Sequence, residues 1–119
     1  MARLCRVGAQ TGVVCCYAVV DYENDVIKRH ERTRPDKEDD RTRHIDALDA
    51  NTGPVFLTYK ARPDIDGLVV CLTDSAPTYD FVAPDGIQHA LWVIDQAEDR
   101  DALVDAFRSV PELYVADGH

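Results

Sequence analysis

The segment TYDFVAPDGIQHALWVID, residues 78–95, is the strongest constraint on how this chain can fold. Two runs of β-prone residues flank Pro84-Asp85-Gly86, and an Asp-Gly pair favours the tight turn that joins two antiparallel strands. The pattern predicts a β-hairpin, so the fold should contain antiparallel sheet. His89 is expected to be a structural histidine in the second strand, and Trp92 is expected to be a core residue.

Two further segments have the features of helices. The first starts at the N-cap candidate Asp36, carries acids in its first turn, where the helix dipole favours them, and should end near Ala50. A Gly-Pro pair follows it, as is common after a helix. The second helix, within residues 96–110, repeats apolar residues at helical spacing and is followed by a proline.

Short apolar runs predict the strands. Strands are expected at residues 3–7, 11–22, 54–60 and 112–116, with a further strand possible from Val26 and Ile27. Residues 64–76 are ambiguous, because the run LVVCL fits a buried strand while its length and the acids before it allow a helix. These elements predict one α+β domain over residues 1–119, with a mixed, largely antiparallel sheet and two to three helices packed on it.

The four cysteines follow no metal-binding or redox motif, because no two of them have C-x-x-C spacing. Two of them are adjacent in a predicted strand, so their side chains should point to opposite faces. We expect all four to be buried or half-buried small apolar residues. They are Cys5, Cys15, Cys16 and Cys71.

The net charge of −9 disfavours nucleic acid as a partner, because binding to phosphate backbones needs a cationic surface. No apolar run approaches the roughly 20 residues that span a bilayer. The first ten residues lack the apolar stretch of a signal peptide. We therefore expect a cytoplasmic protein with neither nucleic acid nor membrane as a partner.

Positive charge is concentrated in KRHERTRPDKEDDRTR, residues 28–43, which hold seven of the 13 Lys and Arg residues but only five of the 22 acids. His30 and Glu31 could work as an acid–base pair. Three arginines could hold a phosphate or carboxylate through paired N–H donors. These are Arg32, Arg34 and Arg41. The alternative is a solvated network of surface ion pairs, and the segment lacks the spacing of a metal site.

The last apolar run leads into Ala-Asp-Gly-His, residues 116–119. Asp and Gly are turn formers, and a turn that leads from a strand into a helix exposes backbone N–H groups to anions. Asp117, Gly118 and His119 are therefore candidate phosphate-binding residues. The alternative is an ordinary polar turn. A site shared with the basic segment requires the two to lie within roughly 15 Å of each other, so that side chains from both can reach one ligand.

Four segments together carry a family resemblance: IKRHERTRPDKEDDR, GPVFLTY, HALWVI and LYVADGH. From about Gly12 to His119 the chain resembles a widespread prokaryotic family of unknown function, the domain-of-unknown-function family numbered ten-fifteen. Members of that family are longer, so the resemblance implies that this chain is a middle piece. The family signature Ala-Asp-Gly-His-His-Arg continues into a helix, and residues 116–119 match its first four positions.

The signature in turn resembles the phosphate-binding box of the ParB and sulfiredoxin-like superfamily, which includes a free-serine kinase. The resemblance implies that the complete protein binds a nucleotide or phosphate at the terminal turn. Our first hypothesis is that it binds ATP or ADP with magnesium there and phosphorylates a small hydroxylated metabolite. The alternative is a non-catalytic domain that senses a nucleotide or anion and binds a protein partner through its acidic surface. An open sheet edge would also favour a homodimer.

Overall fold

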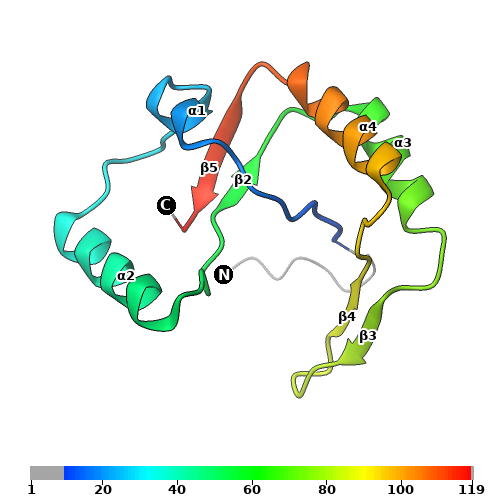
Figure 1. The fold of residues 1–119 in the computed structure, drawn as a ribbon, viewed down its shortest axis with the longest axis horizontal. Coiled ribbons are helices and arrows are strands. Elements are labelled where there is room, and N and C mark those ends of the chain that lie inside the picture. Colours follow the sequence, from blue (N-terminus) through cyan, green and yellow to red (C-terminus); the bar gives the residue numbers. More distant parts are fainter. Residues whose placement is uncertain (1–9, 119) are drawn as a thin grey trace.

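A mixed three-stranded sheet lies at the centre of the computed structural model, which describes residues 10–118 (Figure 1). Its strands, in spatial order, are β1 (Ile27–Lys28), β5 (Leu113–Asp117) and β2 (Phe56–Thr58). β5 pairs in parallel with β1 and antiparallel with β2. The middle strand of the sheet is therefore the last one in the sequence.

β3 (Tyr79–Val82) and β4 (Gln88–Leu91) form a separate antiparallel hairpin, as the Asp-Gly turn predicts. Gly86 adopts a φ of 81°, in the left-handed region that favours glycine. The N–H of Ala83 donates to the carbonyl of Ile87 at 2.9 Å and closes the turn. The hairpin projects away from the three-stranded sheet, at the lower right of Figure 1.

Four helices complete the described residues 10–118, and the α+β class is confirmed. They are α1 (Val19–Glu23), α2 (Pro35–Leu48), α3 (Pro63–Leu72) and α4 (Ala97–Arg108). The sheet is mixed as expected, although the strands divide into two separate sheets and the short α1 raises the number of helices above the expected two to three. Within residues 10–118, no helix combines the length and the apolar character needed to cross a membrane.

The buried side chains of residues 10–118 form two small groups. Ile27, Leu113 and Val115 gather on the sheet, where Tyr22 and Leu57 are among the half-buried residues that pack on them. Ile65 of α3 and Leu103 of α4 are buried in the second region, where these two helices pack together. The rings of Tyr59 and Phe107 meet edge to face, with centroids 5.3 Å apart. Trp92, expected in the core, is half-buried and its indole N–H donates to the carbonyl of Ser75 at 2.8 Å.

Arg62 joins the start of α3 to the end of α4. Its Nε and Nη2 donate to the two carboxylate oxygens of Asp64 at 2.9 and 2.8 Å. Its Nη1 donates to the carbonyl of Ser109 at 2.9 Å, and Nη2 also donates to the Ser109 hydroxyl at 2.8 Å. The hydrogen bond from Arg62 holds the pKa of Asp64 below its usual value. The sequence of residues 64–76 allowed either a strand or a helix. In the structure the helix α3 begins at Pro63, and the contact from Arg62 helps to hold it in place.

α2 confirms the predicted helix with a shifted start. It begins at Pro35, with Arg34 rather than Asp36 as the N-cap residue, because proline is well suited to the first helical position. It ends at Leu48, followed by Asp49 in the left-handed conformation. α2 packs against no other helix or strand of the described chain, and its apolar residues Ile45 and Leu48 are exposed.

The strand predicted at residues 11–22 is wrong, because residues 11–18 form no regular element and Val19–Glu23 form α1. Strands need a hydrogen-bonding neighbour, and no strand of residues 10–118 pairs with this segment. Its side chains Val14, Val19 and Val20 are exposed. The other N-terminal strand, at residues 3–7, lies outside the described residues.

The expected burial of the cysteines is also wrong where the structure describes them. Cys15, Cys16 and Cys71 are exposed and carry free thiols, while Cys5 lies outside the described residues. Cys15 and Cys16 belong to the irregular segment before α1, where the regular alternation of a strand does not apply.

Candidate functional site

Two segments meet at the end of β5 in the three-stranded sheet. β1 and β5 run parallel, with Ile27 opposite Leu113 and Lys28 opposite Tyr114, so the chain leaves β1 in the same direction but three residues before β5 ends. β2 runs the other way, and its first residue Phe56 lies opposite Asp117. The end of β5 therefore brings together residues 53–55 and 117–118, and we call these residues the carboxyl edge. Open sheets that contain parallel strands commonly bind ligands at such an edge.

Gly118 forms the turn that follows β5. Its φ is 79°, and a Cβ at this position would lie 3.0 Å from the carbonyl oxygen of Pro54 and 3.4 Å from the Cα of Val55. Both the backbone conformation and the close approach therefore favour glycine. The N–H of Gly118 donates to Oδ1 of Asp117 at 2.8 Å. The turn is thus packed directly against the segment that enters β2.

Arg41 reaches this edge from α2. Its Nη1 lies 3.5 Å from the position that a Cβ would occupy at Gly53, the residue before Pro54. Pro54 in turn contacts Gly118, so Arg41 and the Gly118 turn both lie against the segment Gly53-Pro54. A site shared by Arg41 and the Gly118 turn stays a prediction. Within residues 10–118, its side chain has no ion pair or hydrogen bond.

The other predicted site residues belong to the segment that leaves β1. His30 Nε2 lies 3.4 Å from Glu31 Oε1, and the two side chains are 47% and 68% exposed. Arg34 forms an ion pair with Asp36 at 2.9 Å, so its charge is already partly balanced, and Arg32 is exposed. These residues belong to the segment between β1 and α2, and their catalytic and binding roles stay predictions. His119 lies outside the described residues.

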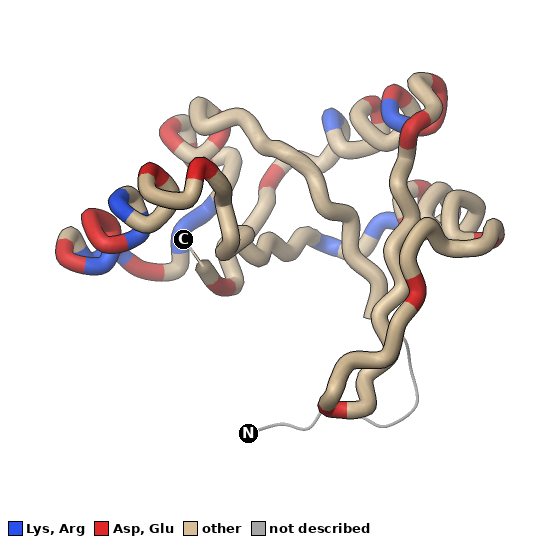
Figure 2. The backbone as a smooth tube through the Cα atoms, turned by 60° about the horizontal axis from the view of Figure 1, so that its bottom comes forward, with Lys and Arg blue, Asp and Glu red and all other residues tan. Residues whose placement is uncertain are grey.

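The charges around the edge are mixed. Figure 2 shows basic and acidic residues mixed along α2. Asp117 adds a carboxylate that has no ion pair with a cation in the described part of the chain. Residues 10–118 contain no group of three or more His, Cys, Asp or Glu side chains placed to hold a metal ion. A cation at this edge would therefore need most of its ligands from a bound anion and water.

The sequence reasoning missed Gly53 and Pro54 as part of this edge, because it assigned them only to the end of the preceding helix. The structure gives them a second role, because Pro54 contacts the Gly118 turn and Gly53 lies beside Arg41. The segment GPVFLTY contains both residues, and it was one of the segments that carried the family resemblance.

Comparison with curated proteins and with solved structures finds no match. Residues 4–119 match the model of a family described as "Protein of unknown function (DUF1015)". The match covers nearly the whole chain, including every segment of the carboxyl edge. The chain therefore belongs to the DUF1015 family.

Proposed function

We propose that the carboxyl edge binds the phosphate groups of a nucleotide such as ATP with its magnesium ion. The observation that carries the proposal is the approach of Arg41 and the Gly118 turn to the same short segment, Gly53-Pro54. A glycine turn lets the backbone come close to a phosphate, and a guanidinium supplies a planar set of donors that matches phosphate oxygens. The resemblance of the terminal signature to a phosphate-binding box supports the same conclusion.

The charges at the edge suit a ligand that carries both negative and positive charge. Arg41 has no acidic partner within the described chain, so its positive charge remains to be balanced. Asp117 is negatively charged and would repel a bare phosphate, but a carboxylate oxygen is a suitable ligand for a magnesium ion that arrives with the nucleotide. Arg32 would add a second cationic side chain from the segment after β1.

The catalytic form of the proposal is phosphoryl transfer to a small hydroxylated metabolite. The substrate hydroxyl oxygen would form a bond to the γ-phosphorus, the bond from that phosphorus to the bridging oxygen would break, and ADP would leave. Glu31, next to His30, would accept the hydroxyl proton. The exposure of both side chains leaves water free to compete at this position, so closure over the edge would be needed for efficient transfer.

This exposure also favours the second candidate function, in which the edge senses a nucleotide or anion without transferring phosphate. The two functions are separated by assaying ADP formation with a panel of hydroxy amino acids and related alcohols. Transfer that depends on the added alcohol supports the kinase, whereas saturable binding of ATP without transfer supports the sensor.

Replacing Arg41 with alanine is expected to weaken ATP binding by about 10- to 100-fold, the usual effect of losing a hydrogen bond to a charged group. Isothermal titration with ATP and magnesium at fixed ionic strength measures the change. Arg43→Ala is the matched control, because it removes the same charge from the same helix while the Arg43 Nε donates to the helix's own carbonyl at Asp39. Equal loss of affinity in the two variants would show that only the overall charge matters, and absence of binding by the unaltered chain would refute the proposed function.

A further inference from the structure

We infer that Cys15 and Cys16 form a vicinal dithiol, which a small-molecule disulfide oxidises reversibly to a disulfide bond between the two neighbours. Both residues are exposed and carry free thiols. They lie on the irregular segment before α1 and belong to no part of the carboxyl edge. The inference therefore does not depend on the proposed nucleotide binding.

The spacing of the pair decides what kind of disulfide it forms. Consecutive Cα atoms are about 3.8 Å apart across a trans peptide bond, whereas most disulfides join Cα atoms about 4.4–6.8 Å apart. A disulfide between adjacent residues is therefore strained, and strain makes a disulfide easier to reduce. Strained or exposed disulfides are the labile and regulatory ones. The pair thus suits reversible oxidation rather than a permanent cross-link.

The backbone around the pair is free to adapt to the bent ring that such a bond closes. Residues 11–17 belong to no helix or strand, and within residues 10–118 their backbone groups form no hydrogen bonds with other backbone groups. In a helix or a strand, the same bend would break hydrogen bonds of that element. Here ring closure breaks none within the described chain, so its cost is confined to the ring itself.

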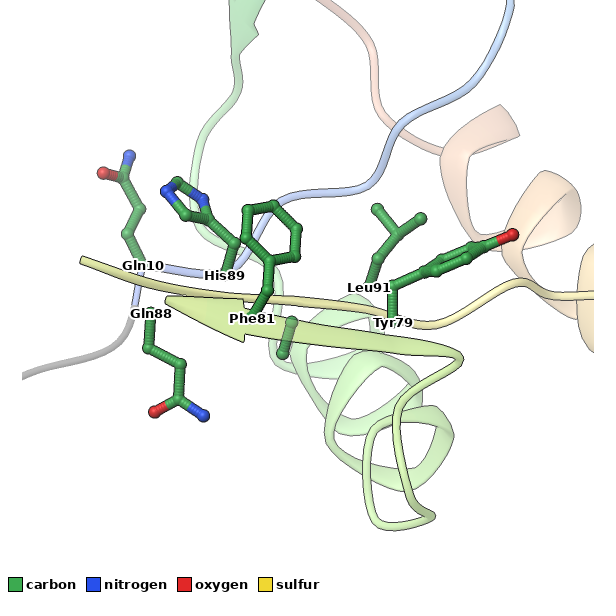
Figure 3. Close-up of a pocket in the computed structure, with 7 residues that line it drawn as sticks. Gln10, Tyr79, Phe81, Gln88, His89 and Leu91 are labelled. Atoms are coloured by element: carbon green, nitrogen blue, oxygen red, sulfur yellow. The ribbon is translucent and has the colours of Figure 1, made fainter. Parts of the chain in front are cut away.

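Contacts on both sides of the pair hold the segment in place without burying the cysteines. At its start, Gln10 lines an open groove together with Phe81 and His89 of the hairpin, as Figure 3 shows. After the pair, the Tyr17 hydroxyl forms a hydrogen bond with Cys15. Partial burial and this hydrogen bond raise the pKa of Tyr17, so the hydroxyl keeps its proton and acts as the donor. The two thiols are therefore accessible on a segment that has a defined position.

The reaction consists of two successive thiol–disulfide exchanges. In the first, the thiolate of one cysteine attacks a sulfur of the small disulfide, which forms a mixed disulfide and releases one small thiol. In the second, the thiolate of the adjacent cysteine attacks the protein sulfur of the mixed disulfide and releases the other small thiol. The two cysteines lose two electrons, the small disulfide gains them, and the two cysteine protons end on the released thiols.

Treating the reduced full chain with glutathione disulfide, then alkylating the remaining thiols and digesting with trypsin for mass spectrometry, tests this inference. Trypsin cleaves after lysine and arginine, so residues 7–28 form one peptide that contains Cys15 and Cys16 but neither Cys5 nor Cys71. We expect this peptide to lose two hydrogen atoms and to carry no glutathione. With the released thiol kept micromolar, the closed form should exceed the mixed disulfide by at least about 10-fold, because the adjacent thiol acts at a millimolar effective concentration.

Cys15→Ser and Cys16→Ser each leave one thiol in this peptide, so the closed form should be lost and glutathione should stay attached. Cys71→Ser is the matched control, because it removes an exposed cysteine from α3 and should leave closure unchanged. Millimolar dithiothreitol should reopen the ring, and circular dichroism should be the same before and after oxidation.

Five results would each overturn the inference. The peptide of residues 7–28 could stay unmodified, carry two glutathiones, or become cross-linked to the peptide that contains Cys71. The ring could also close only in denaturant, or resist dithiothreitol once it has closed.

Discussion

Replacing Ile65 with alanine is expected to lower the free energy of unfolding by about 2–5 kcal/mol, the usual cost of emptying a fully buried aliphatic site. Ile65 is completely buried in α3, and this helix packs on α4. Few side chains of residues 10–118 are buried at all, so the neighbours of Ile65 have little else to hold them in place. A loss of this size is a large share of the stability of a small domain.

Val70→Ala is the control for this prediction, because Val70 lies on the same helix and is 69% exposed. Its effect should stay within about 0.5 kcal/mol. Urea titrations followed by circular dichroism give both free energies. If the two variants unfold at the same urea concentration, Ile65 is not part of a packed core and the arrangement of α3 on α4 is incorrect.

Replacing Gly118 with valine is expected to reduce ATP binding by more than about 10-fold. A β-branched residue is strained at a φ of 79°, at a cost of roughly 1–2 kcal/mol. In addition, its Cβ would lie 3.0 Å from the carbonyl oxygen of Pro54, a backbone atom that cannot move aside alone. The turn would therefore open away from Gly53 and Arg41. The affinity, measured by titration calorimetry, should fall because the two halves of the site separate.

Gly86→Val separates backbone strain from this contact. Gly86 has nearly the same φ, 81°, but nothing lies within 4 Å of the position of its Cβ. The substitution should strain the hairpin turn and leave the affinity for ATP unchanged. Retention of full affinity by Gly118→Val, or an equal loss in both variants, would contradict the assignment of the Gly118 turn to the site.

Local sequence patterns predicted the elements whose signals are themselves local. The Asp-Gly pair located the hairpin turn, the spacing of Leu103 and Phe107 predicted α4, and the acids after Pro35 marked the start of α2. Strand formation at residues 11–22 was predicted from composition alone. Composition indicates only that the residues are of types common in strands. A strand also needs a neighbouring strand that supplies backbone hydrogen bonds. The structure provides none among the described residues, and part of the segment forms α1.

The long-range features could not be predicted in the same way. The ambiguous run before Leu72 is helical in the structure, where hydrogen bonds from Arg62 to Ser109 join residues far apart in the sequence. Similarly, the carboxyl edge exists because β2 pairs with the end of β5, which lies far along the chain from it. The sequence alone marks Arg41 and Gly118 as candidates for phosphate binding. Only the strand pairing and the position of Pro54 bring them to one place.

The most direct test of the central claim is a titration of the ¹⁵N-labelled chain with ATP and magnesium, followed by backbone amide chemical shifts. We predict saturable shifts that are largest at Gly118, Gly53 and Val55, the amides that surround the proposed phosphate position. The amide of Gly86, in the distant hairpin turn, should not move. Shifts that are absent, that spread along α2 without saturating, or that centre on the hairpin would contradict nucleotide binding at the carboxyl edge.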